Sequence, residues 1–133
     1  SCKSENTHYY SFLDSNWNSQ QIVKFDITTK DSTQVRISNI SIRHNTSYEY
    51  QNIIFFLHHS YKENIISTDT IELLLADKSG KWLGSGIGDI REIKTLLATG
   101  KTYFKKEKKT IKIEQAMRHG SAEKITNLKL TYN

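Results

Sequence analysis

The sequence predicts an all-β fold: an antiparallel β-sandwich of the jelly-roll or immunoglobulin-like kind, with about eight strands and at most one short helix. Apolar and polar residues alternate with a period of two along several short segments, as in a strand with one buried face. Polar turn sequences such as Asn45-Thr46-Ser47 and Lys62-Glu63-Asn64 separate these segments. No long helical pattern interrupts them, so the residues favour two packed sheets.

The first predicted strands carry the clearest alternation. Residues 23–28 read Val-Lys-Phe-Asp-Ile-Thr, and residues 35–38 repeat the pattern. The alternation is then offset by one position along residues 39–43. A β-bulge produces such an offset while it keeps the apolar side chains on the buried face. We therefore expect a bulge near Asn39.

The later strands are less uniform. Residues 52–57, Asn-Ile-Ile-Phe-Phe-Leu, are apolar on both parities, which predicts a central strand covered on both sides. Residues 70–75, 110–114 and 128–132 follow as further strands. The segment at residues 90–98 is ambiguous, because its apolar positions also fit one face of a helix. Two turns of helix are an alternative there.

A chain of 133 residues has the length of one domain and buries about two-thirds of its unfolded surface. We expect residues 1–7 to be a lipid-anchor tether and residues 8–133 to be a single β-sandwich. Cys2 is the only cysteine, and it follows a small residue and precedes a polar run. That arrangement is typical of a bacterial lipoprotein whose signal has been removed and whose thiol is acylated. A cloning scar or an exposed thiol is the alternative.

Composition excludes several classes of function. The net charge of +5 is spread along the chain apart from the run at residues 105–109, which argues against a nucleic-acid partner. No apolar run approaches the roughly 20 residues that a membrane-spanning helix needs. Any membrane association must therefore come from an anchor.

The sequence contains no recognisable catalytic or metal-binding pattern. His58 and His59 are adjacent in a predicted strand and so point to opposite faces, and the other histidines lack ligand spacing. No serine lies in a G-x-S-x-G elbow. We therefore expect no enzyme activity, no catalytic residues, no metal site and no cofactor.

Residues 77–90 hold four of the six glycines and form the densest motif. Gly80 suits the positive-φ position of a turn that begins at Asp77. Three further glycines at a spacing of two leave one face of the segment without side chains, namely Gly84, Gly86 and Gly88. Such a face lets a backbone or a large ring lie against it, and Trp82 has the matching parity. The motif is either a tryptophan-packed corner of the sandwich or a docking surface for a partner loop or an extended ligand.

A second motif, Glu114-Gln115-Ala116-Met117-Arg118, ends a predicted strand with several polar groups. Arg118 is able to form a bidentate pair with a carboxylate, for which Asp77 and Asp89 are suitable. We hypothesise that Arg118 clamps the glycine-rich segment.

These two motifs resemble those of the gliding motility lipoprotein GldH family of the Bacteroidota. The resemblance rests on residues 75–89 and 113–118, with weaker support from residues 43–53 and from Cys2, in family order across nearly the whole chain. It implies a lipoprotein of the cell envelope, acylated (for example by palmitate) at Cys2 and required for gliding. It also implies action with other motility lipoproteins and with type IX secretion components. The family supplies no catalytic residues.

The function we expect is that of a non-catalytic scaffold anchored to a membrane, the outer membrane in our interpretation, through acyl groups on Cys2. Its partners would be other gliding and type IX secretion proteins of the envelope. The residues that match the motifs are candidates for interaction or for folding alone: Asp77, Trp82, Gly84, Gly86, Gly88, Asp89, Glu114, Gln115, Met117 and Arg118.

The alternative is a glycan-binding module, because β-sandwiches also serve that function. It would need aromatic rings exposed in a groove, for which the chain offers Tyr48, Tyr50, Tyr61 and Trp82. Exposed rings would favour a glycan, whereas a buried Trp82 would favour the scaffold.

Overall fold

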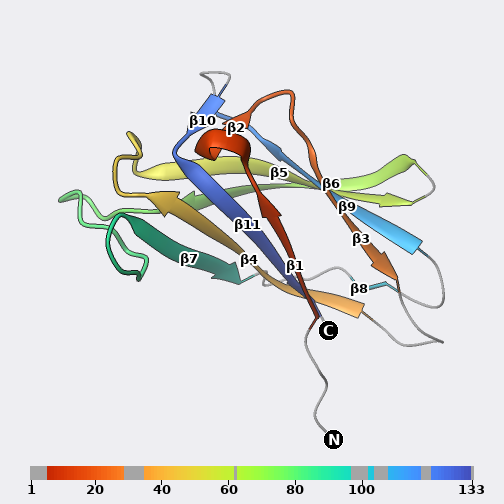
Figure 1. The fold of residues 1–133 in the computed structure, drawn as a ribbon. Helices are drawn as coiled ribbons and strands as arrows, with labels where there is room; N and C mark the ends of the chain where they lie inside the picture. The colour runs from red at the N-terminus through yellow and green to blue at the C-terminus, as the bar shows by residue number, and fades with distance from the viewer. Residues whose placement is uncertain are drawn as a thin grey trace, which may run out of the picture.

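The computed structural model describes residues 6–28, 35–61, 63–96, 102–103, 108–117 and 121–132. Two antiparallel sheets face each other across one core, as Figure 1 shows. The fold is therefore the all-β sandwich that the sequence predicts. Cys2 and Arg118 lie outside the described residues, so the anchor and the proposed clamp are not part of this description.

The first sheet has the strand order β1-β11-β4-β7, and the short β8 pairs with the beginning of β4. Its strands are β1 (Asn6–Ser11), β11 (Ile125–Tyr132), β4 (Val35–Asn45), β7 (Ile90–Leu96) and β8 (Thr102–Tyr103). The second sheet has the order β3-β9-β5-β6. Its strands are β3 (Val23–Thr28), β9 (Lys108–Gln115), β5 (Asn52–Tyr61) and β6 (Asn64–Leu74).

A short two-stranded antiparallel sheet lies at one end of the sandwich. It consists of β2 (Asn16–Asn18) and β10 (Ser121–Glu123), and a 3₁₀ turn, η1 (Leu13–Ser15), leads into it. The described residues thus form eleven strands, three more than expected. β1 also lies outside the strand segments predicted from the sequence, and β2, β8 and β10 are only two or three residues long. Segments of that length are too short to show a period of two.

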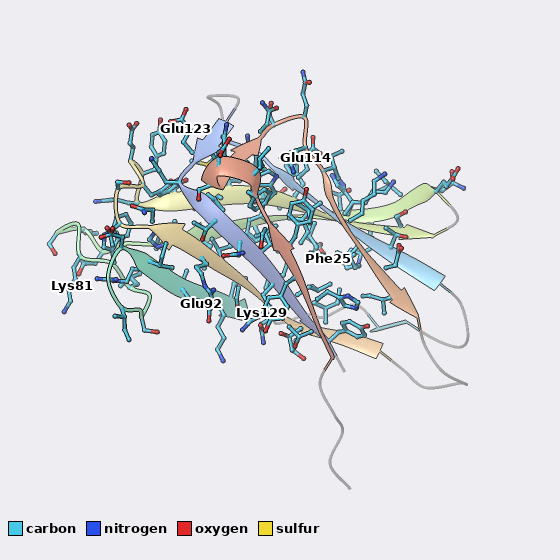
Figure 2. The ribbon with its side chains drawn as sticks, in the orientation of Figure 1. Phe25, Lys81, Glu92, Glu114, Glu123 and Lys129 are labelled. Atoms are coloured by element: carbon cyan, nitrogen blue, oxygen red, sulfur yellow. The ribbon has the colours of Figure 1, made fainter. Side chains whose placement is uncertain are left out.

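The core lies between the sheets and follows the alternation in the sequence. Ile40 and Leu130 face inward from the first sheet, and Phe55 and Ile113 face inward from the second, all without exposed surface. Phe25 lies between the two layers in Figure 2. Each such side chain contributes about 1.5–3 kcal/mol relative to exposure, so the inward faces fix the register of every strand.

The expected β-bulge is confirmed. Asn39 pairs with Thr131, whereas Ile37 pairs with the next residue, Tyr132. Ser38 is therefore the extra residue, and it lets Ile37 and Ile40 both remain buried.

The structure decides one alternative that the sequence left open and corrects one expectation about a strand. Residues 90–96 form β7 rather than a helix, because every residue of β7 pairs with a residue of β4. The strand β5 is central, as predicted, but only one of its faces is fully buried. Ile54 and Phe56 lie on the outer face and are partly exposed, so the apolar run does not indicate cover on both sides.

Candidate functional site: the glycine loop and the outer groove

The motif begins with a tight turn that Asp77 organises. Its Oδ1 accepts hydrogen bonds from the backbone N–H and the hydroxyl of Ser79, at 2.9 and 2.6 Å, and from the N–H of Lys81 at 2.9 Å. The Ser79 hydroxyl is the largest cause that lowers the pKa of Asp77. Gly80 has φ +89°, the positive-φ position that the sequence predicts. Asp77 therefore has a complete local role in shaping the turn.

Trp82 attaches this turn to the body of the sandwich. Its ring centroid lies 4.6 Å from that of His44, a residue with no exposed surface. The Nδ1–H of His44 donates to the carbonyl of Asn45 at 3.0 Å, while its Nε2 is buried without a partner in the described part of the chain. Burial is the main cause that lowers the pKa of His44, and the charge of Arg91 acts in the same direction. The packed corner expected around Trp82 thus exists, with His44 as its centre.

The rings that the glycan alternative required are not an open platform. Tyr48 is buried, and its hydroxyl donates to the carbonyl of Asn52 at 2.9 Å. Tyr50 and Trp82 are partly buried and pack against the core. The side chain of Tyr61 lies outside the description. These rings stabilise the corner.

The residues that follow, 83–89, are named here the glycine loop. Ser85 forms a backbone bridge with Glu92, its N–H donating at 3.0 Å and its carbonyl accepting at 2.8 Å. A Cβ on Gly84 would lie 2.6 Å from the carbonyl oxygen of Glu92, and one on Gly86 would overlap that of Ile90. The bare face at Gly84 and Gly86 is therefore occupied by the backbone of β7, whereas a Cβ on Gly88 would meet open space. The expectation that the Trp82 ring would lie there is wrong.

The end of the loop is held by polar contacts. Gly88 has φ +68°, and its carbonyl accepts from the guanidinium of Arg91 at 2.8 Å. The carbonyl of Asp89 accepts from the N–H of Thr46 at 2.7 Å, while its side chain is exposed. Ile87 lies between Ser85 and Gly88, which both make such polar contacts, and 96% of its surface is exposed. The loop backbone is therefore hydrogen-bonded on both sides of an exposed apolar side chain.

The second motif lies elsewhere and has structural contacts. Gln115 is buried, and its Oε1 accepts from the N–H of Met117 at 2.7 Å. The Sδ of Met117 accepts from the N–H of Ile54 at 3.3 Å. Glu114 points to the outer face of the second sheet, where its Oε1 lies 3.0 Å from Nε2 of His58. Lys81, beside the glycine loop, and Glu114 lie well apart in Figure 2, so these described parts of the two motifs do not form one site.

The sequence alone does not predict a recess on the outer face of the first sheet, although the glycine loop supplies part of its lining. One cavity of about 640 Å³ is lined by Arg43, Ser85 and Glu92 and by the apolar Ile87 and Ile90, among others. A second cavity of about 340 Å³ has only polar lining residues and adds Ser41, Lys94 and Lys129. The two share Ser85 and Glu92, and together they are named here the outer groove. Figure 2 shows Glu92 and Lys129 on this face. No single sequence motif indicates the whole groove, because its side chains come from five separate segments: β1, β4, the glycine loop, β7 and β11.

An ion-pair network crosses the outer groove. Glu92 lies 3.0 Å from Nη2 of Arg43 through Oε1 and 3.8 Å from Nζ of Lys129 through Oε2. In the described part of the chain no three His, Cys, Asp or Glu side chains gather to hold a metal ion. Nor does the described part contain a helix long and apolar enough to cross a membrane.

Comparison with known proteins places the whole described fold in one family. The family model of the GldH lipoprotein matches residues 5–130. The chain belongs to this family. The gliding motility lipoprotein GldH homolog of Christiangramia forsetii is 31% identical over 84% of this chain and 70% of its own length. The gliding motility lipoprotein GldH of Flavobacterium johnsoniae is 27% identical over 82% of this chain and 67% of its own. The GldH match therefore includes the glycine loop, the outer groove and the second motif.

Solved structures of similar shape are more distant from this GldH family member. Latent dimeric PorU from Porphyromonas gingivalis aligns with a TM-score of 0.40 and 10% identity, over 96% of this chain and 12% of that one. The infectious bursal disease virus Gx strain aligns with a TM-score of 0.36 and 9% identity, over 98% of this chain and 32% of that one. Likenesses at this level carry no argument about function.

Proposed function

We propose that this member of a gliding motility lipoprotein family is a non-catalytic scaffold of the cell envelope. Acyl groups on Cys2, such as palmitate, hold it at the outer membrane. It presents a docking surface to other gliding components and to the type IX secretion machinery. Family membership supports the lipoprotein and gliding parts of this proposal. One acyl chain gives only marginal attachment, so stable anchoring implies two or more.

The observation that carries the scaffold role is the presentation of Ile87. Single exposed apolar residues are ordinary on protein surfaces. Ile87, however, is 96% exposed, Leu83 on the same loop is 52% exposed, and the loop backbone is locked against β7. Because the backbone that carries Ile87 is already held, docking costs little backbone entropy, and this favours contact with an apolar pocket of a partner.

Site-specific photo-crosslinking in gliding cells tests the docking role. A photoreactive residue at Ile87 should capture a gliding or type IX secretion protein of the envelope. The same residue at Leu13, which is 83% exposed, is the matched control and should not. Ile87→Ser should abolish gliding at unchanged protein level, whereas Leu13→Ser should not. Equal capture from both positions, or normal gliding of Ile87→Ser cells, would refute the docking role.

The anchor is tested separately. Intact mass of the mature protein from native membranes should show acyl groups on Cys2, and Cys2→Ser should release the protein from the membrane fraction. A mature protein without acyl groups would contradict the anchoring proposal and leave the docking experiment unaffected.

A further inference from the structure

The register of the first sheet aligns four side chains in one row across its outer face. Tyr9 pairs with Lys129, Lys129 with Ser41, and Ser41 with Lys94. The row therefore reads aromatic, cation, small hydroxyl, cation. Since neighbouring strands are about 4.8 Å apart, the two lysines stand about 10 Å apart with only a serine between them. The small side chain at the centre makes this part of the outer groove a trough.

The floor of the trough is polar and sheltered. Ser41 and Thr131 are 3% and 5% exposed although they point away from the core. Residues of this face are directed outward because their neighbours in sequence, Ile40 and Leu130, are completely buried on the other side. Both residues line the second cavity, so its floor is polar, and the small exposed part of each residue faces the groove.

The charge of the groove is positive. Its lining carries three cationic side chains, Arg43, Lys94 and Lys129, against the single carboxylate of Glu92. Glu92 contacts Arg43 and Lys129, and the structure gives Lys94 no ion-pair partner among the described residues. The groove is therefore complementary to an anionic ligand, and Lys94 offers the cation that Glu92 does not already engage.

One end of the row offers a stacking surface. Tyr9 is 67% exposed, and Nζ of Lys129 lies 6.0 Å from its ring centroid. An exposed ring presents an apolar face beside polar groups, which suits the C–H face of a sugar ring. A phospholipid surface would instead require apolar side chains around the cations to enter the acyl region. Ile87 and Ile90 line the first cavity of the groove, whereas the second cavity, which holds Lys94 and Lys129, is lined by polar residues alone. The hydroxyl floor and the ring favour a sugar polymer.

We propose that the outer groove binds an acidic glycan, a linear sugar polymer carrying carboxylates. One carboxylate lies between Lys94 and Lys129 above Ser41, and a neighbouring sugar ring stacks on Tyr9. This inference goes beyond the scaffold role, because it assigns the sheet face a ligand of its own.

Calorimetric titration of the full 133-residue chain with a short oligogalacturonate tests the proposal, with the fully methyl-esterified oligomer as the neutral control. The acidic oligomer should bind, its affinity should fall as salt is added, and the ester should not bind. Vesicles containing phosphatidylglycerol and inorganic phosphate form two further arms. Binding of the ester as strongly as the acid, binding only to the vesicles or to phosphate, or no binding of the acid overturns the proposal.

Single substitutions test where on the protein the ligand binds. Lys94→Gln should weaken binding about five- to tenfold, the effect of one charge contact at a partly exposed site. Lys24→Gln makes the same charge change on the exposed face of the second sheet and should leave binding unchanged. Tyr9→Ala should weaken binding about fivefold. Equal losses in Lys94→Gln and Lys24→Gln would overturn the proposal.

Glu92→Gln should strengthen binding about fivefold, because it frees Arg43 and Lys129 from their carboxylate partner. A gain cannot arise from misfolding. A loss of affinity in this variant would show that the anion does not meet these cations.

Discussion

The carbonyl oxygen of Glu92 lies 2.6 Å from the position that a Cβ on Gly84 would occupy. Real Cβ atoms do not approach a backbone oxygen so closely, so the glycine is required by the neighbouring strand. Gly88 differs, because its φ is +68° and a Cβ there would meet open space. Two glycines of one motif are thus needed for different reasons, one by contact and the other by backbone conformation.

The two glycines should respond differently to substitution. Gly84→Ala forces the loop away from β7 and should lower the free energy of unfolding by about 2–3 kcal/mol. Gly88→Ala has only the left-handed conformation to overcome and should cost about 1 kcal/mol. Denaturant unfolding of each variant measures both values. Asn tolerates positive φ, so Gly88→Asn should recover part of the loss and Gly84→Asn should not. Equal losses at both positions would contradict this account.

Substitutions at two adjacent residues of the second motif should also differ in their effect on stability. Gln115→Ala removes the acceptor of the Met117 N–H from a buried position and should cost about 1–2 kcal/mol of stability. Glu114→Gln changes a partly exposed contact with His58 and should stay within about 0.5 kcal/mol. Urea midpoints compare the pair directly. A larger loss for Glu114→Gln than for Gln115→Ala would show that the motif is held from its outer face.

The strands were predictable where apolar and polar residues alternate, because the apolar positions are the buried ones. The offset at Asn39 became a bulge because burial of Ile37 and Ile40 leaves no other register. β7 was ambiguous because Ile90, Ile93 and Leu96 recur every three residues, which also fits a helix, and only the ladder with β4 decides between them.

The sites were less predictable, because they depend on pairing between distant segments. Lys129, Ser41 and Lys94 form one row through the register of three strands, and no pattern around any one of them indicates the others. The partner of Trp82 was missed for the same reason, since His44 belongs to a strand nearly forty residues earlier. The sequence shows that the glycine positions lack side chains, but it does not show which backbone packs against them.

Trp82 should matter for stability more than for docking. Trp82→Ala removes a partly buried ring that covers His44 and should cost about 2 kcal/mol, whereas Trp82→Phe keeps an aromatic contact and should cost less than about 1 kcal/mol. Thermal unfolding checks the order. Ile87→Ser, whose side chain is exposed, should melt as the wild type does. Loss of stability in Ile87→Ser would indicate that the loop tip packs on this chain rather than on a partner.

His44 should make stability depend on pH. Burial lowers its pKa in the folded protein below the ordinary value of 6.5, so the folded state binds fewer protons than the unfolded state as pH falls through and below that value. Proton binding then stabilises the unfolded state more than the folded state. The free energy of unfolding should therefore be full above about pH 7 and decrease as pH is lowered toward 5. His44→Phe keeps a ring against Trp82 and removes the titrating group, so its curve should be flatter over this window. Urea titrations of both proteins at each pH measure the difference, and identical slopes would mean that His44 binds its proton equally well in the folded and unfolded chains.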